Sequence, residues 1–312
     1  MQNFLVAVNA VSPLFVMMAL GYVIRLTGNV TENGLKEMNY LIYKIFLPIL
    51  MYINIITIDL KNDLDWSLMI STTVIIIGIF IVLFLAVPVI EKENSRRGVL
   101  IQGMFRSNYI VFGLTIATAI YGDKGLGAIT LLSAITIPLM NALSVVALEA
   151  FRGNKPDIKS ILIGIATHPL ILAAAIALVM AALGLVPPEL ILSPLQSMSK
   201  VTTPLALIVI GASFQFKRIK SFYKQLILGV AGRLIIVPAL CLPVCIVLGF
   251  RDVSLTGLLV VFGGPCATSS FAMAQQMGGD GELAGAMVVF TSAFCVITIF
   301  CWILLLKFLA LI

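Results

Sequence analysis

Residues 260–270 read VVFGGPCATSS and interrupt an apolar stretch, near residues 254–277, that is long enough to span a bilayer. Pro265 removes one backbone hydrogen bond and clashes with the carbonyl four residues earlier, while Gly263 and Gly264 lower the cost of unwinding. Irregular backbone at membrane depth survives only where it is packed in protein or lines a wet cavity. A half-helix that begins after such a break directs free N–H groups and partial positive charge at the gap. The stretch therefore predicts a broken helix that suits an anion, with a proline kink absorbed by packing as the alternative.

The composition of the whole chain places it in a membrane. Hydrophobic residues make up 61% of its 312 residues, charged residues only 11%, and the mean hydropathy is +1.13. A soluble domain with a charged surface does not reach these values. The formal charge of +6 does not indicate nucleic acid, because the basic residues gather in short loops and not in a stripe with aromatic residues. We expect lipid around the chain and no nucleic-acid partner.

The two halves of the chain repeat one pattern. Lys44 precedes Pro48 by four residues, Lys200 precedes Pro204 by four residues, and the two pairs lie 156 residues apart. An internal duplication in a very apolar chain is typical of secondary transporters, because two copies that face opposite ways supply a site reachable alternately from each side.

Ten apolar segments are expected to span the membrane, five in residues 1–156 and five in residues 157–312. Because five is an odd number, the second unit must insert upside down, and the repeat is inverted. The expected fold class is therefore an all-α integral membrane protein. The ten segments lie near residues 4–26, 35–58, 66–90, 97–121, 125–149, 159–184, 192–214, 222–249, 254–277 and 282–311.

Basic residues between these segments predict the orientation. Loops after odd-numbered segments carry twelve Lys and Arg residues, and the opposite loops carry four. Because Lys and Arg are enriched in cytoplasmic loops, both termini are expected on the extracytoplasmic side of a bacterial plasma membrane. The twelve are Arg25, Lys36, Lys92, Arg96, Arg97, Arg152, Lys155, Lys159, Lys217, Arg218, Lys220 and Lys224, and the four are Lys61, Lys124, Arg251 and Lys307.

Arg106 lies in the first-half counterpart of the opening stretch, residues 103–113 (GMFRSNYIVFG). A charged side chain near the bilayer centre costs roughly 2.5–3.5 kcal/mol on insertion scales, so it needs a partner or water. The segments offer no acidic partner at mid-depth, since Asp123 and Glu149 fall at segment ends. The arginine fork suits bidentate pairing with a carboxylate. The alternative is that the side chain snorkels to the cytoplasmic face.

Four further polar residues within the segments have structural interpretations. Lys44 and Lys200 each sit one turn before a proline, where the ammonium can approach a carbonyl freed by the break, and proton coupling is the alternative. His168 is the only histidine, which excludes a His-based metal site, and it is expected to be a hydrogen-bonded core residue. Arg233 is expected to snorkel or to pair with lipid headgroups.

Enzyme and metal signatures are absent from the sequence. It contains no Gly-x-Ser-x-Gly, no His-Glu-x-x-His, no P-loop and no dinucleotide-binding glycine motif. All five cysteines lie within apolar segments, where a small buried hydrophobe is the usual role, so we expect neither disulfides nor metal. We expect no enzyme and no cofactor, with an intramembrane hydrolase built on a Ser/Lys dyad as the alternative.

Four stretches, in order and at matching spacing, carry a resemblance to a known family. They are residues 43–52 (YKIFLPILMY), 107–113 (SNYIVFG), 204–212 (PLALIVIGA) and 265–280 (PCATSSFAMAQQMGGD), of which the last is the most specific. With them the chain resembles, nearly end to end, a bacterial member of the auxin efflux carrier family of membrane transport proteins, which is related to the plant carriers.

This resemblance implies a fold similar to that of bile-acid symporters and the NhaA antiporter, with crossed broken helices four and nine. Helices 1, 2, 6 and 7 would form a scaffold, and helices 3–5 and 8–10 a moving transport domain. The plant carriers have a proline where this chain has Asn108, and they have a long central hydrophilic loop that it lacks. The first departure bears on how far the helix unwinds there, and the second removes a regulatory platform. A third departure, Arg106 beside the crossing, favours a small carboxylate over an indole acid. The candidate substrate-binding residues are Arg106, Ser107, Asn108, Gly264, Pro265, Thr268 and Ser269.

The expected function is secondary active transport of a small organic anion, such as a mono- or dicarboxylate, by elevator-type alternating access. A sensor with a transporter fold that binds the anion without net flux is the alternative. Coupling to Na⁺ or H⁺, uniport and exchange stay open, and a homodimer would use the scaffold helices. The coupling candidates are Lys44, Lys200, Thr115 and Gln275, and the expected structural breaks are Pro48, Pro204 and Gly211.

Overall fold

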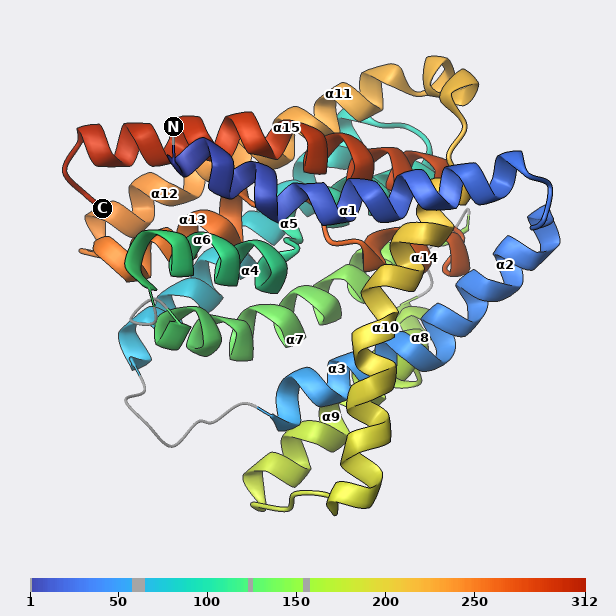
Figure 1. The fold of residues 1–312 in the computed structure, drawn as a ribbon, viewed down its shortest axis with the longest axis horizontal. Coiled ribbons are helices and arrows are strands. Elements are labelled where there is room, and N and C mark those ends of the chain that lie inside the picture. The colour runs from blue at the N-terminus through green and yellow to red at the C-terminus, as the bar shows by residue number, and fades with distance from the viewer. Residues whose placement is uncertain (1, 58–64, 123–125, 154–157) are drawn as a thin grey trace.

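Every regular element in the described part of the chain is a helix, as the sequence predicts (Figure 1). The structure is a computed structural model that describes residues 2–57, 65–122, 126–153 and 158–312. Its α-helices are α1 (Gln2–Leu26), α2 (Glu32–Leu41), α3 (Leu47–Ile56), α4 (Trp66–Ile90), α5 (Asn94–Phe105), α6 (Tyr109–Tyr121), α7 (Leu126–Ala150), α8 (Ile158–Ala166), α9 (Pro169–Ala182), α10 (Glu189–Ser213), α11 (Tyr223–Ala231), α12 (Val237–Val247), α13 (Asp252–Gly263), α14 (Ser269–Gln276) and α15 (Gly281–Phe308), with π-helical turns η1 (Ile42–Phe46) and η4 (Gly232–Ile236) and a 3₁₀ helix η3 (Phe216–Ser221).

Six helical stretches in the described residues are long and apolar enough to cross a membrane. The other four predicted segments correspond to α1 and to three pairs of shorter helices, α5 with α6, α8 with α9, and α13 with α14. Large apolar side chains lie exposed on the outer surface, as lipid contact requires; Val89, Leu190 and Phe308 are 82%, 87% and 88% exposed. The six stretches are Glu32–Ile56, Trp66–Ile90, Ile129–Ala150, Glu189–Ser213, Tyr223–Val247 and Gly281–Phe308.

The two π-helical turns each come just before a proline. Pro48 follows η1 and Pro238 follows η4. Because proline has no N–H, the carbonyl four residues earlier loses its helical partner, and the widened turn absorbs the distortion. Near η4 the indole Nε1 of Trp302 donates to the carbonyl of Leu234 at 3.1 Å and replaces the missing bond. The helix that contains Pro48 is therefore distorted there, as expected, but it is not broken.

Helix α10, by contrast, continues without interruption through Pro204 and Gly211, so the breaks expected at these residues do not occur. Gly211 instead allows α10 to touch α1. A Cβ atom at Gly211 would lie 1.9 Å from the Met18 carbonyl oxygen, and one at Gly21 would lie 2.0 Å from a carbonyl oxygen of α10. Only glycine permits this approach, so the two helices pack backbone against backbone.

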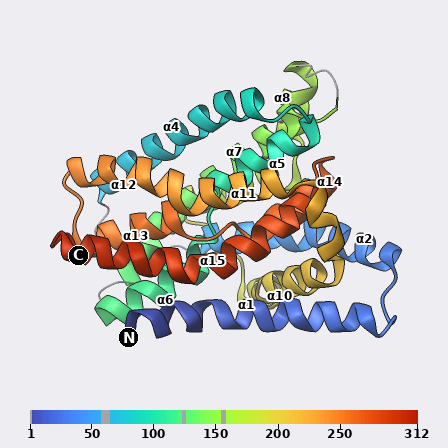
Figure 2. The ribbon, with the colours of Figure 1, turned by 90° about the horizontal axis from the view of Figure 1, so that it is seen from above.

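The helices pack in two groups. The smaller group contains α1, α2, α3, α9 and α10, in which α10 contacts α1, α2 and α3, and α3 contacts α9. The larger group contains α4 to α7 and α11 to α15, which contact one another extensively. The two groups also contact each other, since α1 packs against α6 and α15, and α3 and α9 pack against α7. Helix α8 contacts α7 of the larger group and α9 of the smaller one. Figure 2 shows α4 and α1 on opposite sides of the molecule, with α13 and α15 between them. Helices α3, α9 and the lower part of α10 project from the rest in Figure 1.

Charged residues gather where the loops after α1, α4, α10 and α14 come together. We call this end of the molecule the charged face. Arg96 pairs with Asp280 at 3.1 Å and joins the start of α5 to the start of α15. Arg218 pairs with Glu282 at 2.8 Å, and Arg25 pairs with Glu32 at 3.5 Å. The structure thus places loops that follow odd-numbered segments at one end of the molecule.

Candidate functional site

Two helices are interrupted at matching places, and the interruptions touch. Helix α5 ends at Phe105 and α6 begins at Tyr109, while α13 ends at Gly263 and α14 begins at Ser269. Between these ends, Ser107 forms an isolated antiparallel bridge with Cys266. The predicted breaks around Arg106 and Pro265 are therefore present, and the two extended segments cross. We call this region the crossing.

Backbone groups freed by one break bind those freed by the other. The Asn108 N–H donates to the Pro265 carbonyl at 2.8 Å, and the Ser107 hydroxyl donates to the Val260 carbonyl at 2.8 Å. At Gly264 a Cβ atom would lie 2.6 Å from the Val260 carbonyl oxygen and 2.8 Å from Ser107 Oγ. The glycine is thus required for close approach, and the crossing satisfies backbone groups that a bilayer could not.

Arg233, in η4, joins the ends of both interrupted helices. Its side chain is fully buried, and the guanidinium donates to four carbonyls: Nη1 to Met104 at 3.0 Å and Phe105 at 2.9 Å, Nε to Gly264 at 2.6 Å, and Nη2 to Val261 at 2.8 Å. These carbonyls belong to the C-terminal ends of α5 and α13, which lack helical partners and carry partial negative charge. The expectation that Arg233 snorkels toward lipid is wrong, because backbone acceptors hold it inside the protein.

Arg106 occupies the first break with its side chain 4% exposed, so it does not snorkel either. The guanidinium donates to Asn141 Oδ1 of α7, to Ser269 Oγ at the start of α14, and to Met273 Sδ at 2.8 Å. All three acceptors are neutral, and a thioether is a weak one. Among the described residues no carboxylate forms an ion pair with Arg106. The guanidinium charge is therefore buried without a counter-charge.

Beside Arg106 lies a cavity of about 160 Å³, which we call the crossing cavity. Residues of the smaller helix group close it on one side, and residues of the crossing line the other. The Nδ2 atom of Asn108 is buried there with no hydrogen-bond partner in the described structure. Its lining residues are Leu47, Leu50, Asn54, Arg106, Ser107, Asn108, Tyr109, Ile110, Ile137, Met140, Asn141, Thr202, Thr203, Ala206, Ala267, Thr268 and Ser269.

The electrostatics of the crossing cavity favour an anion. Two helices, α6 and α14, begin at its wall at Tyr109 and Ser269, and a helix N-terminus carries free N–H groups and partial positive charge. Arg106 adds a full positive charge, and the unpaired Nδ2 of Asn108 is a further donor that is buried beside the cavity and does not open into it. None of the described lining residues is acidic. A carboxylate in this cavity would lie near the guanidinium of Arg106 and the free N–H groups at the two helix starts. Carboxylates prefer donors of this kind.

Five of the seven predicted substrate-binding residues line this cavity: Arg106, Ser107, Asn108, Thr268 and Ser269. Gly264 and Pro265 lie in the crossing itself and support it through their backbone carbonyls.

The predicted coupling residues lie elsewhere. Thr115 is in α6, beyond the break, and Gln275 lines a second cavity at the charged face. Lys44 and Lys200 have exposed side chains. His168 is buried at the start of α9, where its Nε2 meets the Tyr43 hydroxyl at 2.8 Å and its Nδ1 accepts from the Leu170 N–H. It is a hydrogen-bonded core residue, as predicted.

An all-helical chain with apolar surfaces, two interrupted helices that cross, and an electropositive cavity beside them belongs to the class of membrane carriers. Comparison with known proteins agrees with this class. The model of the membrane transport protein family matches residues 6–159 and 157–303, so the chain belongs to this family, and the resemblance to auxin efflux carriers is confirmed. The chain is 22% identical over 308 residues to an uncharacterized transporter of Methanocaldococcus jannaschii, covering 96% of this chain and 98% of that protein. The protein is therefore embedded in a membrane.

Proposed function

We propose that the protein is a secondary active transporter that binds a small organic anion, such as a mono- or dicarboxylate, in the crossing cavity. The observation that carries this proposal is the pairing of Arg106 with three neutral acceptors at the wall of a cavity that has no acidic residue among its described lining residues. A buried charge without a counter-charge is costly, and an incoming carboxylate relieves that cost. The cavity volume of about 160 Å³ suits a solute of a few carbon atoms.

The transport motion is of the elevator type. The smaller helix group is the scaffold, formed by the first, second, sixth and seventh membrane segments, and the larger group is the transport domain. The packing of the helices in these two groups supports this assignment, and so does the position of the crossing cavity between them. The site therefore moves with the larger group against the smaller one, and the cavity opens to one side of the membrane at a time.

The remaining features of the proposal concern topology and partners. The ten segments form two inverted repeats, residues 1–156 and 157–312, in a bacterial plasma membrane with both termini extracytoplasmic. The gathering of loops after odd-numbered segments at the charged face supports this orientation. Coupling to Na⁺ or H⁺, uniport and anion exchange are the three modes of transport that this proposal leaves open. Lipid surrounds the chain, and a homodimer uses the smaller helix group.

The test is binding and transport of simple carboxylates by the purified protein. We expect succinate or acetate to raise the unfolding temperature in detergent, since a ligand of the folded state stabilises it by mass action. Arg106→Gln is expected to lower the affinity that this shift reports by about 10- to 100-fold, and to lower the uptake of the same anion into proteoliposomes. The matched control is Lys224→Gln, which removes a positive charge from an exposed side chain of α11 and leaves both intact.

Three other results would contradict the proposal. Unchanged uptake by Arg106→Gln and Asn108→Ala would show that the crossing cavity is not the binding site. Stabilisation by the anion without uptake under any Na⁺ or H⁺ gradient would indicate a sensor. Conversion of the anion to a product in detergent, where no gradient exists, would indicate an enzyme.

A further inference from the structure

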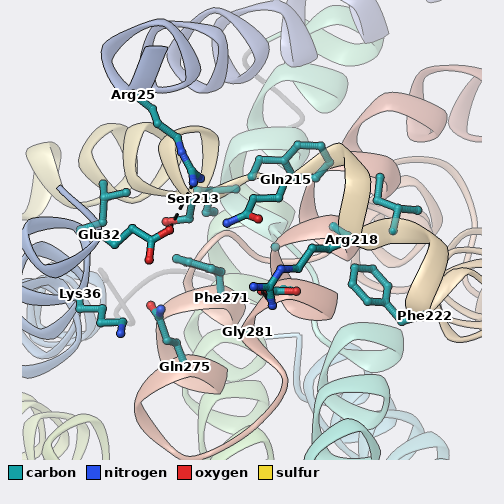
Figure 3. Close-up of a pocket in the computed structure, with 17 residues that line it drawn as sticks. Arg25, Glu32, Lys36, Ser213, Gln215, Arg218, Phe222, Phe271, Gln275 and Gly281 are labelled. Atoms are coloured by element: carbon teal, nitrogen blue, oxygen red, sulfur yellow. Dashed lines mark ion pairs between the residues drawn. The ribbon is translucent and has the colours of Figure 1, made fainter. Parts of the chain in front are cut away.

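A second cavity, of about 310 Å³, lies at the charged face between the two helix groups (Figure 3). We call it the charged-face cavity. Glu32 and Lys36 of α2 lie on one side of it, and Arg218 of η3 lies on the other. Phe271 and Gln275 of α14 lie between them, and the Oε1 atom of Gln275 is buried with no hydrogen-bond partner among the described residues.

The two cavities lie along the same three helices. Thr202 and Ala206 of α10 line the crossing cavity, and Ile210 and Ser213 line the charged-face cavity. With a rise of 1.5 Å per residue, Ala206 and Ile210 are about 6 Å apart along the axis. On α14, Ser269 lines the first cavity and Phe271 begins the second.

The third helix is the one formed by α2, η1 and α3. Leu35 lines the charged-face cavity, and Leu47 and Leu50 line the crossing cavity. Asn39 lies between them in sequence, about 6 Å along the axis from Leu35. Helix α2 contacts both α10 and α14, so the part of the protein between the cavities is a seam where these three helices meet (Figure 1).

Asn39 is the polar side chain that α2 presents to this packing. It is 0% exposed, and neither Oδ1 nor Nδ2 has a hydrogen-bond partner within the described residues. Buried polar groups are almost always hydrogen-bonded, so an amide with both atoms unpaired requires an explanation. A core position with no further role would be occupied more favourably by leucine, which has the same number of side-chain heavy atoms and the same branching but no polar atoms.

We propose that Asn39 is a polar binding station on a closed passage between the crossing cavity and the charged-face cavity. This inference rests on the proposed function. When α2 separates from α10 and α14, the Asn39 Nδ2 donates to the carboxylate in transit. Amide donors without a partner among the described residues then lie at Asn108, which lines the crossing cavity, and at Asn39, whereas the unpaired Oε1 of Gln275 is an acceptor and does not bind the anion. In the closed state Asn39 is 0% exposed, so neither water nor the anion reaches it.

The first test uses thiol accessibility and needs no substrate. Asn39→Cys is made in a background from which the five native cysteines are removed, and it is treated in membranes with a charged methanethiosulfonate reagent. The matched control retains only native Cys245, which is equally buried at 0% exposure but lies in α12. We expect labelling at position 39 at least tenfold faster than at Cys245. Equal rates overturn the passage.

The second test separates transport from stability. Asn39→Leu is expected to raise the unfolding temperature, because it removes two unpaired polar atoms, and to lower succinate uptake at least tenfold. Succinate binding at the crossing cavity, measured by thermal shift, should stay within twofold. Thr72→Val is the control, since Thr72 is equally buried but its hydroxyl is satisfied by the Leu68 carbonyl at 2.6 Å. It should not change uptake.

These outcomes distinguish the passage from the proposed function. If Asn39→Leu takes up succinate at the wild-type rate, Asn39 is not a binding station. If Asn39→Leu loses stability as well as uptake, the amide of Asn39 has a purely structural role, and the proposal is also wrong. If the wild-type protein neither binds nor transports any carboxylate, the proposed function fails. In that case the labelling rate of Asn39→Cys still tests, by itself, whether the passage exists.

Discussion

Two buried arginines meet the crossing of the interrupted helices, and they bind different kinds of group. Arg233 donates to four backbone carbonyls at distances of 2.6 to 3.0 Å. Arg106 donates to two neutral side-chain oxygens and a thioether, beside a cavity. The backbone acceptors of Arg233 are fixed parts of both helix ends, whereas the acceptors of Arg106 can be replaced by a ligand. Similar burial therefore accompanies a structural role for Arg233 and, in the proposed function, a binding role for Arg106.

The largest expected effect comes from Arg233→Met, which tests the structural half of this comparison. The substitution leaves four carbonyls at the ends of α5 and α13 unpaired, and we expect a loss of about 3–5 kcal/mol of stability. Thermal unfolding in detergent and the yield of monodisperse protein measure it. Arg233→Lys should recover only part of the loss, because an ammonium cannot span four acceptors. If Arg233→Met is as stable as the wild-type protein, Arg233 has no structural role, and the proposed difference between the two arginines is wrong.

Arg106→Met tests the other half. It removes an uncompensated buried charge, so the unfolding temperature should stay the same or rise. Anion affinity should fall by about 10- to 100-fold, the equivalent of about 1.5–3 kcal/mol for a hydrogen bond to a charged group. Titration of succinate against the unfolding temperature measures both quantities in one experiment. A large loss of stability with intact affinity would show that Arg106 acts as Arg233 does.

Gly264→Ala should disturb the crossing that both arginines share. Its Cβ atom would lie 2.6 Å from the Val260 carbonyl oxygen, which belongs to backbone and cannot move freely. We expect a loss of about 1–3 kcal/mol from overpacking, measured by thermal unfolding. Gly78→Ala in α4 is the matched control, because no atom lies within 4 Å of the added Cβ. The free energy of unfolding of that variant should increase by about 0.5–1 kcal/mol. Equal changes in stability at the two positions would contradict the close approach of Gly264 to the Val260 carbonyl.

The smallest effect is expected for Ser269→Ala, which removes one neutral acceptor of Arg106. Because Arg106 keeps its charge and its other two acceptors, anion affinity should change by about tenfold at most, the equivalent of about 1.4 kcal/mol. Binding measured as before would detect it, and stability should hardly change. A loss of affinity as large as that of Arg106→Met would show that the hydroxyl contacts the anion more directly than the guanidinium.

The interruption of two helices could be predicted from the sequence because its causes are local. Gly264 and Pro265 disfavour a helix whatever surrounds them, and an arginine at mid-span must find a partner or a ligand. The distortion before Pro48 was predictable for the same reason. Pro204 has the same local chemistry, yet α10 is continuous through it. Proline alone therefore does not decide between a kink, a π-helical turn and a break; tertiary packing does.

The role of Arg233 depends on tertiary structure and was missed. Its four acceptors come from residues 28 to 129 positions away in the chain. The repeat gave no indication, since the position 157 residues earlier is Ile76. The only available sign was an arginine within a membrane segment, which is a functional hypothesis by default. Asn39 was likewise invisible, because an asparagine near a helix start looks ordinary until its burial is known.

The π-helical turn at residues 42–46 holds one residue more than an α-helix with the same packing would need. Ile42 and Leu47, both buried, are five residues apart across this wide turn and lie on one face, as residues four apart do in an α-helix. Deletion of one residue in the turn would restore ordinary α-helical pitch and leave Leu47 at the crossing cavity and Leu35 at the charged-face cavity. Helix α10 has no such extra residue, and a deletion between Ala206 and Ile210 would rotate its two parts by about 100° relative to each other. The helix that contains η1 can therefore lose one residue there and keep its packing, whereas α10 cannot.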